Sequence, residues 1–329
     1  MKLYLSAQDY QSPDDRARAT AEAYEQELQD ALRGAVTEYR QGIDWDKVGV
    51  ALAAGGTASA IAALNFQRLD GYILGATESL DDTFDASAKA TLPNVIHLPY
   101  RPGTVVIDSV KAHRDALVAE IRTSTEDGLS EAVQAAVRAH IPPNQIISVL
   151  RDTVGLTPRQ SLAVLNYRLA LEEGASSLDR ALDDQAWLLR DHRFDGTIQR
   201  IADGEPVDQE TIDRMVARYS ERQIGFRARM IARTETLRVA NAGARSNWLN
   251  AVADGVVPES SIVRYWRAAL DERTCPVCIS IPLLNPHGVG LNEPFESIDG
   301  PVMEPIEDTH PMCRCTIAYD SPSAMGEAA

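Results

Sequence analysis

The chain has 329 residues, of which 44% are hydrophobic and 6% aromatic. This composition excludes a disordered chain and a protein made mainly of membrane-spanning helices, and its Ala- and Leu-rich apolar content favours packed helices over a β-sandwich. There are 32 Lys and Arg against 48 Asp and Glu, giving a net charge of −16. This balance argues against a general nucleic-acid binder, because coating a polyphosphate requires a cationic surface.

Residues 1–125 are predicted to form an N-terminal helical region whose role is open. Its first helix is expected to begin at Ser12-Pro13, where a hydroxyl cap precedes proline, and to end at Gly42. No apolar core of signal-peptide length precedes Asp9, which predicts synthesis in a reducing cytoplasm. Three prolines interrupt residues 92–107, so an irregular loop or a short extended pair is expected there.

One stretch, residues 48–66, carries no charge over 19 positions, a length that would just reach across a bilayer. It consists mostly of Ala and Gly, with Gly55-Gly56 near its centre. We expect a buried helical hairpin, and a membrane-active segment is the alternative.

Residues 126–257 are predicted to form a helical body. Shorter helices are expected at 142–150, at 157–174 behind a Thr157–Gln160 capping box, and at 178–189.

A long helix is then expected from Asp208 to about Ala253, with kinks or breaks at Gly225 and Gly243. This helix holds a basic stretch: residues 213–250 contain 8 basic and 3 acidic residues, a net charge of +5. The stretch is either a solvated face paired with the protein's own acids or a docking surface for DNA or an acidic partner. The candidate docking residues are Arg214, Arg218, Arg222, Arg227 and Arg229.

Residues 258–320 are predicted to form a small α+β module, because a β-prone run at 262–268 is followed by proline-rich sequence with little helical periodicity. Residues 321–329 are expected to form a tail. The predicted fold is therefore mainly α: an elongated helical body followed by a small, β-rich, zinc-knuckle-like C-terminal module.

All four cysteines and one histidine fall within this module. Two thiolates spaced as Cys-x-x-Cys can reach one tetrahedral metal, and a returning strand could supply the rest of the shell. We expect a structural zinc held by Cys275, Cys278, His310 and one of Cys313 and Cys315.

Two other interpretations of the cysteines stay open. They could pack as reduced thiols without metal, or pair as disulfides after cell lysis. A redox centre is disfavoured, because Cys-x-x-Cys redox motifs open a helix and residues 279–282 are not expected to be helical.

No catalytic residue is predicted. The acids near the cysteines, among them Asp271 and Glu272, are not accompanied by a His-Glu-x-x-His or His-x-Glu pattern. The chain also has no phosphate-binding Gly-x-x-x-x-Gly-Lys, no Gly-x-Ser-x-Gly and no dinucleotide-binding fingerprint.

Three motifs in order resemble the Mu F-like family, the head morphogenesis or minor head proteins of tailed bacteriophages. They are Arg-Thr-Glu at 233–235, Asp-x-Arg-Thr-Cys-x-x-Cys at 271–278, and His-Pro-x-Cys-Arg-Cys at 310–315. The similarity covers about residues 155–320. It departs from the family at residues 279–286, where the family's Leu-Asp-Gly turn is replaced.

The resemblance implies a low-copy protein inside the virion head, associated with the portal oligomer and needed for head assembly or genome delivery. Major capsid or scaffold proteins are further expected partners, together with local contact to packaged DNA, and no enzymatic activity is implied. One alternative is an ejected delivery protein that uses residues 48–66 at the host membrane. Another is a metal-dependent nuclease or hydrolase that depends on Asp271 or Glu272.

Overall fold

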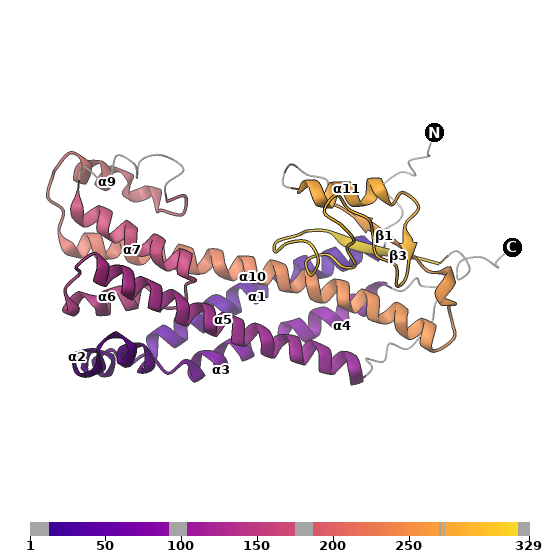
Figure 1. Ribbon diagram of the computed structural model, residues 1–329, viewed down its shortest axis with the longest axis horizontal. Helices are drawn as coiled ribbons and strands as arrows, with labels where there is room; N and C mark the ends of the chain where they lie inside the picture. Colours follow the sequence, from indigo (N-terminus) through magenta and orange to yellow (C-terminus); the bar gives the residue numbers. More distant parts are fainter. Residues whose placement is uncertain (1–12, 92–103, 175–186, 270–271, 273, 322–329) are drawn as a thin grey trace. The chain divides into compact units, whose positions relative to one another are not determined.

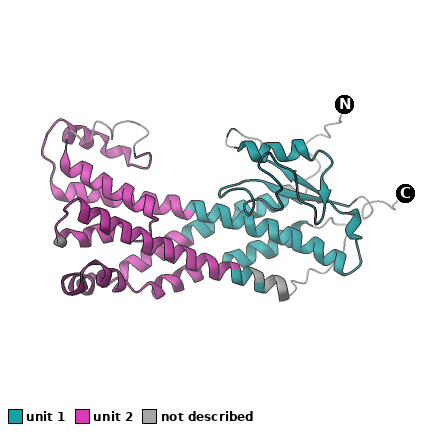
Figure 2. Ribbon diagram, viewed as in Figure 1, with its two compact units in different colours: residues 1–30, 77–112, 229–329 teal, residues 31–76, 113–228 magenta. Residues whose placement is uncertain are grey.

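The structure is a computed structural model that describes residues 13–91, 104–174, 187–269, 272 and 274–321. The chain divides into two compact units, each assembled from segments distant in sequence (Figure 2). Unit 1 comprises residues 1–30, 77–112 and 229–329, and unit 2 comprises residues 31–76 and 113–228. The boundaries predicted after residues 125, 257 and 320 are divisions along the chain, and they remain predictions.

The described chain is mainly α-helical and carries a small C-terminal module with a three-stranded sheet, as predicted (Figure 1). The helices are α1 (Pro13–Gln41), α2 (Trp45–Ala62), α3 (Phe66–Ala76), α4 (Ser79–Thr91), α5 (Thr104–Arg138), α6 (Pro143–Thr153), α7 (Pro158–Glu173), η1 (His192–Phe194), α9 (Asp195–Ala202), α10 (Gln209–Ala253), η2 (Glu259–Ser261) and α11 (Pro276–Leu284). The strands are β1 (Val263–Arg267), β2 (Val289–Gly290) and β3 (Thr316–Asp320).

Several predicted helices are confirmed because local signals set their ends. α1 buries Leu28, Leu32, Ala35 and Tyr39 at spacings of three and four, and its last residue precedes Gly42. In α7 the backbone N–H of Thr157 donates to the side-chain oxygen of Gln160 over 3.2 Å, which completes the expected capping box.

The prediction for residues 48–66 was right about helix and wrong about burial. α2 covers residues 48–62 of the segment and α3 begins at its last residue, Phe66. Gly56 interrupts α2 with φ of 74°, a conformation that glycine adopts without strain. Across this fully described segment only Val48, Ala60 and Leu64 are buried, whereas Val50 is 69% exposed. Short Ala and Gly side chains offer little apolar area to bury, so low charge alone did not place the segment in a core.

By length and composition, the helical run Trp45–Thr91 contains a stretch that could cross a membrane, and 17% of that stretch is buried. This finding is weak evidence for membrane insertion, because core helices and signal sequences can satisfy the same criteria.

Two predictions, a loop at 92–107 and a helix at 178–189, fall partly outside the described residues and are wrong in the part that is described. Residues 104–107 were expected in an irregular loop, but they open α5; the rest of that loop, 92–103, is not described. Of the helix predicted at 178–189, residues 178–186 are not described and 187–189 form a turn, where Trp187 has φ of 67°.

The expected kinks in the long helix are absent from the structure, since α10 runs unbroken through Gly225 and Gly243. Gly243 instead permits close packing within unit 1. A Cβ there would lie 2.5 Å from the carbonyl oxygen of Phe84 on α4. The glycine therefore serves the approach of two helices, and it does not break one.

In unit 1 the C-terminal module packs onto α10 (Figure 1). Its antiparallel sheet has the order β2-β1-β3, with Arg264 opposite Tyr319 and Trp266 opposite Ile317. The shared core joins residues of α10 to residues of the module, among them Leu237, Ala240, Ala244, Trp248, Ile262, Trp266, Ile281, Phe295 and Ile317.

Arg264 on β1 is fully buried and ties the module's loops to the sheet. Its guanidinium donates to the backbone carbonyl oxygens of Gly290, Glu293 and Met303 and to the carboxylate of Glu304. A buried guanidinium satisfied in this way orders neighbouring loops, because each lost partner would leave a buried charge short of hydrogen bonds.

Candidate metal centre in the C-terminal module

The first half of the centre is built at the start of α11. Cys275 caps this helix, and its sulfur accepts the backbone N–H of Cys278 over 3.3 Å, with Pro276 in the first helical turn. The expectation that no helix follows Cys278 was therefore wrong. Proline fits the first turn of a helix, and Pro282 removes only one donor near the end of this short helix.

The second half lies in the loop that leads into β3. Within this loop the Cys313 N–H donates to the carbonyl oxygen of His310 over 3.3 Å, and Met312 has φ of 63°. The resulting turn reverses the chain just before β3 pairs with β1. It carries His310, Cys313 and Cys315 to the cysteines of α11.

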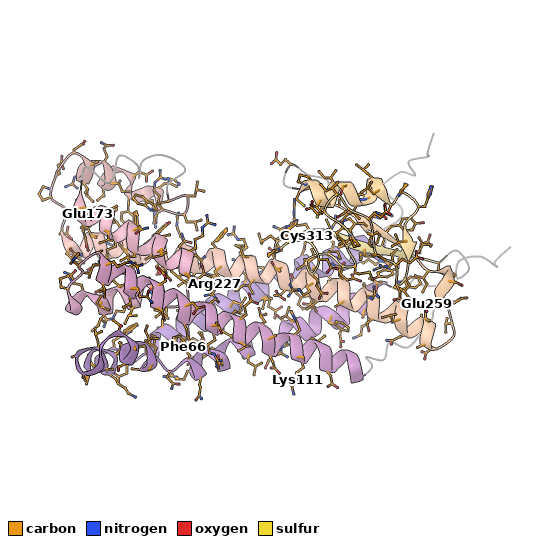
Figure 3. All side chains as sticks on the ribbon, viewed as in Figure 1. Phe66, Lys111, Glu173, Arg227, Glu259 and Cys313 are labelled. Atoms are coloured by element: carbon orange, nitrogen blue, oxygen red, sulfur yellow. The ribbon has the colours of Figure 1, made fainter. Side chains whose placement is uncertain are left out.

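The five predicted ligands come together in two overlapping groups that share Cys278. One group contains Cys275, Cys278 and His310, and the other contains Cys278, Cys313 and Cys315; within each group the ligand atoms lie within 4.8 Å of one another. Cys278 Sγ is 3.6 Å from His310 Nε2 and 3.7 Å from Cys313 Sγ. Figure 3 labels Cys313 within the module.

His310 presents one defined nitrogen to the cluster. Its Nδ1 lies 2.8 Å from the carbonyl oxygen of Pro311, which can only accept, so Nδ1 carries the proton. This contact leaves the lone pair of Nε2 directed to the cysteine side. A second hydrogen bond of this kind commonly fixes the tautomer of a metal-binding histidine.

The pKa values of two thiols in the cluster, Cys278 and Cys275, are shifted in opposite directions. Hydrogen bonds with Cys313 and Cys315, together with burial, raise the pKa of Cys278. The pKa of Cys275 is lowered, because hydrogen bonds from Cys278 and the nearby His310 outweigh the effect of burial. Adjacent buried thiols cannot all ionise without a counter-charge, and a metal cation supplies one.

These residues could hold a metal ion. Both Cys313 and Cys315 belong to the cluster. Because Cys275 does cap a helix, the helix-based argument against a redox pair fails. Three sulfurs and an imidazole gathered around Cys278 nevertheless form the donor set of a metal site more than that of a two-cysteine redox centre.

Sequence reasoning missed the residues on α10 that hold the second half of the centre. The Thr234 hydroxyl oxygen accepts the Met312 N–H over 3.1 Å. The Asn241 side chain accepts the Ile317 N–H over 3.2 Å at the start of β3. Thr234 lies inside the Arg-Thr-Glu motif, and that motif could have identified it. Asn241 lies in none of the motifs described above.

The five arginines proposed for docking differ in their exposure to solvent. Arg214, Arg218, Arg222 and Arg229 are exposed. Arg218 pairs with Glu221 at 2.7 Å and Arg222 with Asp191 at 3.5 Å, as the interpretation of a self-paired helix face expects.

Arg227 does not belong to an exposed surface. It is 8% exposed, and its guanidinium donates to the carbonyl oxygens of Gly155 and Ile121 and to the hydroxyls of Thr125 and Ser124 (Figure 3). Its expected role in docking is therefore corrected to an internal one in unit 2. The helical spacing that grouped it with its neighbours did not reveal which face was buried.

The described residues do not place Asp271 or Glu272, the two acids of the enzymatic alternative, in a catalytic site. Glu272 is exposed, and Asp271 lies outside the described residues.

Comparison with protein-family models, with curated proteins and with solved structures gives no match for this chain.

Proposed function

We propose that this protein is a minor head protein of a tailed bacteriophage. It lies inside the capsid, binds the portal oligomer and is needed for head assembly or genome delivery. A structural zinc ion holds its C-terminal module together. Major capsid or scaffold proteins and packaged DNA are further contacts, and the chain has no catalytic role of its own.

The observation that carries this proposal is the convergence of the three motifs that resemble the Mu F-like family. Thr234 of Arg-Thr-Glu binds the loop of His-Pro-x-Cys-Arg-Cys through Met312. That loop meets Cys-x-x-Cys through Cys278 and His310. Motifs separated along the chain thus form one physical assembly, which supports treating them as a single family signature.

The spacing of the ligands favours zinc. Two sulfurs each about 2.3 Å from one tetrahedral zinc lie about 3.8 Å apart, and a sulfur and an imidazole nitrogen lie about 3.6 Å apart. The corresponding separations from Cys278 are 3.7 Å to Cys313 and 3.6 Å to His310. Sulfur and imidazole donors select zinc over Mg²⁺ or Ca²⁺, which prefer oxygen.

Metal content of the purified full chain tests the zinc assignment. We expect about one zinc per chain by mass spectrometry, lost in a Cys275→Ser/Cys278→Ser variant together with cooperative unfolding of the module. The matched control is Ser280→Ala, in the same helix and outside the cluster. A folded chain without metal would refute the structural zinc.

Co-expression with the portal protein encoded in the same genome tests the head-protein assignment. We expect the zinc-loaded chain to co-purify with the portal oligomer and to stay in DNA-filled heads after nuclease treatment. Reversing the charge of Arg218, Arg222 and Arg229 should weaken this binding, whereas reversing Lys111 and Arg138 on α5 should not. Absence of the folded chain from both preparations would contradict the assignment.

One observation favours a second candidate function, delivery at the host membrane: α2 is apolar and largely exposed. Binding to anionic lipid vesicles tests it. Ala58→Asp in α2 should abolish binding, and Ala23→Asp, at an exposed alanine of α1, should leave it intact. If neither variant changes vesicle binding, α2 is not the membrane-contacting segment.

A further inference from the structure

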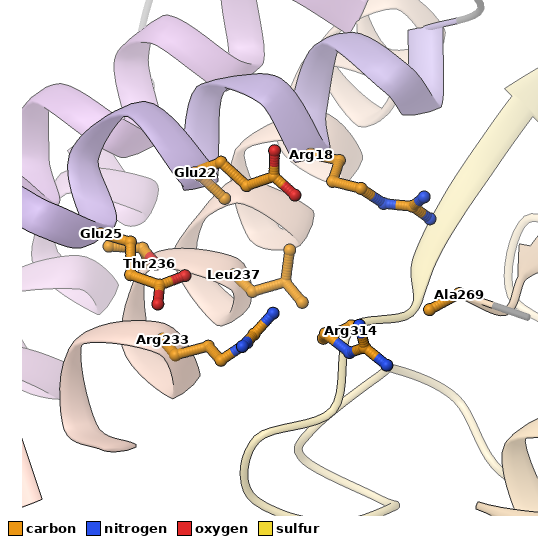
Figure 4. A pocket seen from close by; sticks show the side chains of 9 residues that line it. Arg18, Glu22, Glu25, Arg233, Thr236, Leu237, Ala269 and Arg314 are labelled. Carbon is orange, nitrogen blue, oxygen red and sulfur yellow. The ribbon is translucent and has the colours of Figure 1, made fainter. Parts of the chain in front are cut away.

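A cavity in unit 1 offers no single charge to a ligand. It measures about 140 Å³, and its lining includes Arg18, Glu22, Glu25, Arg233 and Arg314 (Figure 4). Because basic and acidic side chains share this lining, the cavity selects neither an anion nor a cation. The surface of the C-terminal module carries a more uniform feature.

Four exposed apolar side chains gather at α11, which runs along one edge of the module (Figure 1). Ile279, Leu283 and Leu284 belong to α11 and are 39%, 73% and 47% exposed, and Ile298, in the loop that follows β2, is 60% exposed. Among the described residues, every other exposed large apolar side chain lies outside the module. We call these four residues the α11 patch.

Hydrogen bonds hold the loop against the helix and make the patch continuous. The Asn285 side chain donates to the carbonyl oxygen of Glu296 over 2.8 Å and accepts its N–H over 3.0 Å. The Ser280 hydroxyl oxygen accepts the Ile298 N–H over 3.2 Å. Ser280 and Leu284 lie one helical turn apart, so the loop places Ile298 beside the stripe of α11 that carries Leu284.

The opposite side of α11 fixes the helix in the module. Ile281 is fully buried in the core of unit 1, and Cys278 belongs to the metal centre. Ile279 and Leu283, also one turn apart, are left on the outer side. A preformed apolar surface of this kind loses little entropy when a partner covers it.

Acidic side chains border the patch. Glu296 and Asp299 stand on either side of Ile298 in the loop, both are exposed, and within the described part of the chain neither forms an ion pair. Residues 274–292 contain no Lys, Arg, Asp or Glu, and residues 258–320 hold 4 basic and 10 acidic residues, a net charge of −6. This border favours a cationic partner and repels an anionic lipid surface, a nucleic acid or a second copy of the same patch.

We propose that the α11 patch docks a basic amphipathic helix of a partner protein. The nine residues of α11 span roughly 13 Å, and a partner helix with apolar residues at i, i+4 and i+7 spans about 11 Å. Lys or Arg residues beside that apolar stripe pair with Glu296 and Asp299. The proposal is independent of the head-protein assignment, because it depends only on the shape and charge of the module.

Titration of the purified full chain with a synthetic Leu/Lys peptide, observed through isoleucine and leucine methyl signals by NMR, tests the proposal. The peptide carries Leu at i, i+4, i+7 and i+11 and Lys beside them. We expect saturable shifts confined to the methyl groups of Ile279, Leu283, Leu284, Ile298 and their neighbours. A peptide with Glu in place of Lys, and one with the Leu positions scrambled, should each bind at least tenfold more weakly.

Leu283→Ser should weaken binding of the Leu/Lys peptide about tenfold, because it removes the most exposed apolar anchor of the patch. Val137→Ser, at a 55% exposed valine on α5, is the matched control and should change the affinity less than twofold. Should Leu283→Ser fail to fold, Ile298→Ser tests the same surface from the loop.

The acidic border is tested separately. Glu296→Gln/Asp299→Asn should weaken binding about threefold, the effect expected of losing two exposed ion pairs. Glu22→Gln/Glu27→Gln removes two exposed acids from α1 and should leave the affinity unchanged.

Three outcomes would overturn the proposal. The first is equal binding of the scrambled peptide, or an affinity that Leu283→Ser leaves unchanged. The second is binding to anionic lipid vesicles that Leu283→Ser abolishes, which would make the patch a membrane contact. The third is a dimer detected by light scattering and lost in Leu283→Ser, which would make the occupant a second copy of this chain.

Discussion

The hydroxyl oxygen of Thr234 accepts a hydrogen bond from the backbone N–H of Met312 over a distance of 3.1 Å. The same hydroxyl donates to the carbonyl oxygen of Met230, so both its hydrogen-bonding functions are used. Met312 holds a left-handed conformation between His310 and Cys313. A single side chain on α10 thereby fixes the turn that presents two candidate metal ligands.

Thr234→Val should lower the metal affinity of the chain by about 10- to 100-fold, the usual effect of removing an outer-sphere partner. The isosteric change keeps the packing and removes the acceptor that holds Met312. Competition with a chromophoric chelator measures the affinity. Thr236→Val is the control, since that hydroxyl donates to the carbonyl oxygen of Ala232 in its own helix, and an equal loss there would remove Thr234 from its positioning role.

Cys313→Ser should reduce zinc affinity far more than Cys315→Ser. Cys313 Sγ lies 3.7 Å from Cys278 Sγ, close to the separation of two sulfurs on one tetrahedral zinc, and its N–H closes the turn with His310. Chelator competition on the two single variants ranks the ligands. The opposite ranking would identify Cys315 as the fourth ligand.

Arg227→Met should lower the free energy of unfolding by about 2–4 kcal/mol, because the carbonyl oxygens of Gly155 and Ile121 lose a buried charged donor. Burial lowers the pKa of Arg227 to about 10. Urea denaturation provides the measurement. Arg229→Met, at an exposed site two residues along α10, should change stability by less than about 0.5 kcal/mol.

Gly243→Ala should destabilise the protein by about 1–3 kcal/mol even though alanine is the better helix former, because the new Cβ would meet the carbonyl oxygen of Phe84. Gly225→Ala is the matched change in the same helix. Its Cβ would meet nothing closer than 3.6 Å, so the substitution should stabilise by about 1 kcal/mol. Thermal unfolding of both variants distinguishes close packing from simple helix propensity, which would make both changes stabilising.

The sequence by itself determined the elements whose signals are local. The Thr157–Gln160 capping box, the apolar spacing of α1 and the β-prone run at β1 each set a structure through residues a few positions apart. The gathering of Cys275, Cys278, His310, Cys313 and Cys315 in one module was also predictable, because the Cys-x-x-Cys pair and the His-x-x-Cys-x-Cys run are each typical of residues that converge on one ion.

Only the tertiary structure decided which faces were covered. It left most of residues 48–66 unburied despite their lack of charge, buried Arg227 among carbonyl oxygens, and turned Gly243 from an expected kink into a contact point. It also brought Arg18 to a cavity shared with Arg233 and Arg314, which lie near the other end of the chain. Burial and convergence depend on partners far away in sequence, and helical periodicity shows only that a face exists, not what packs against it.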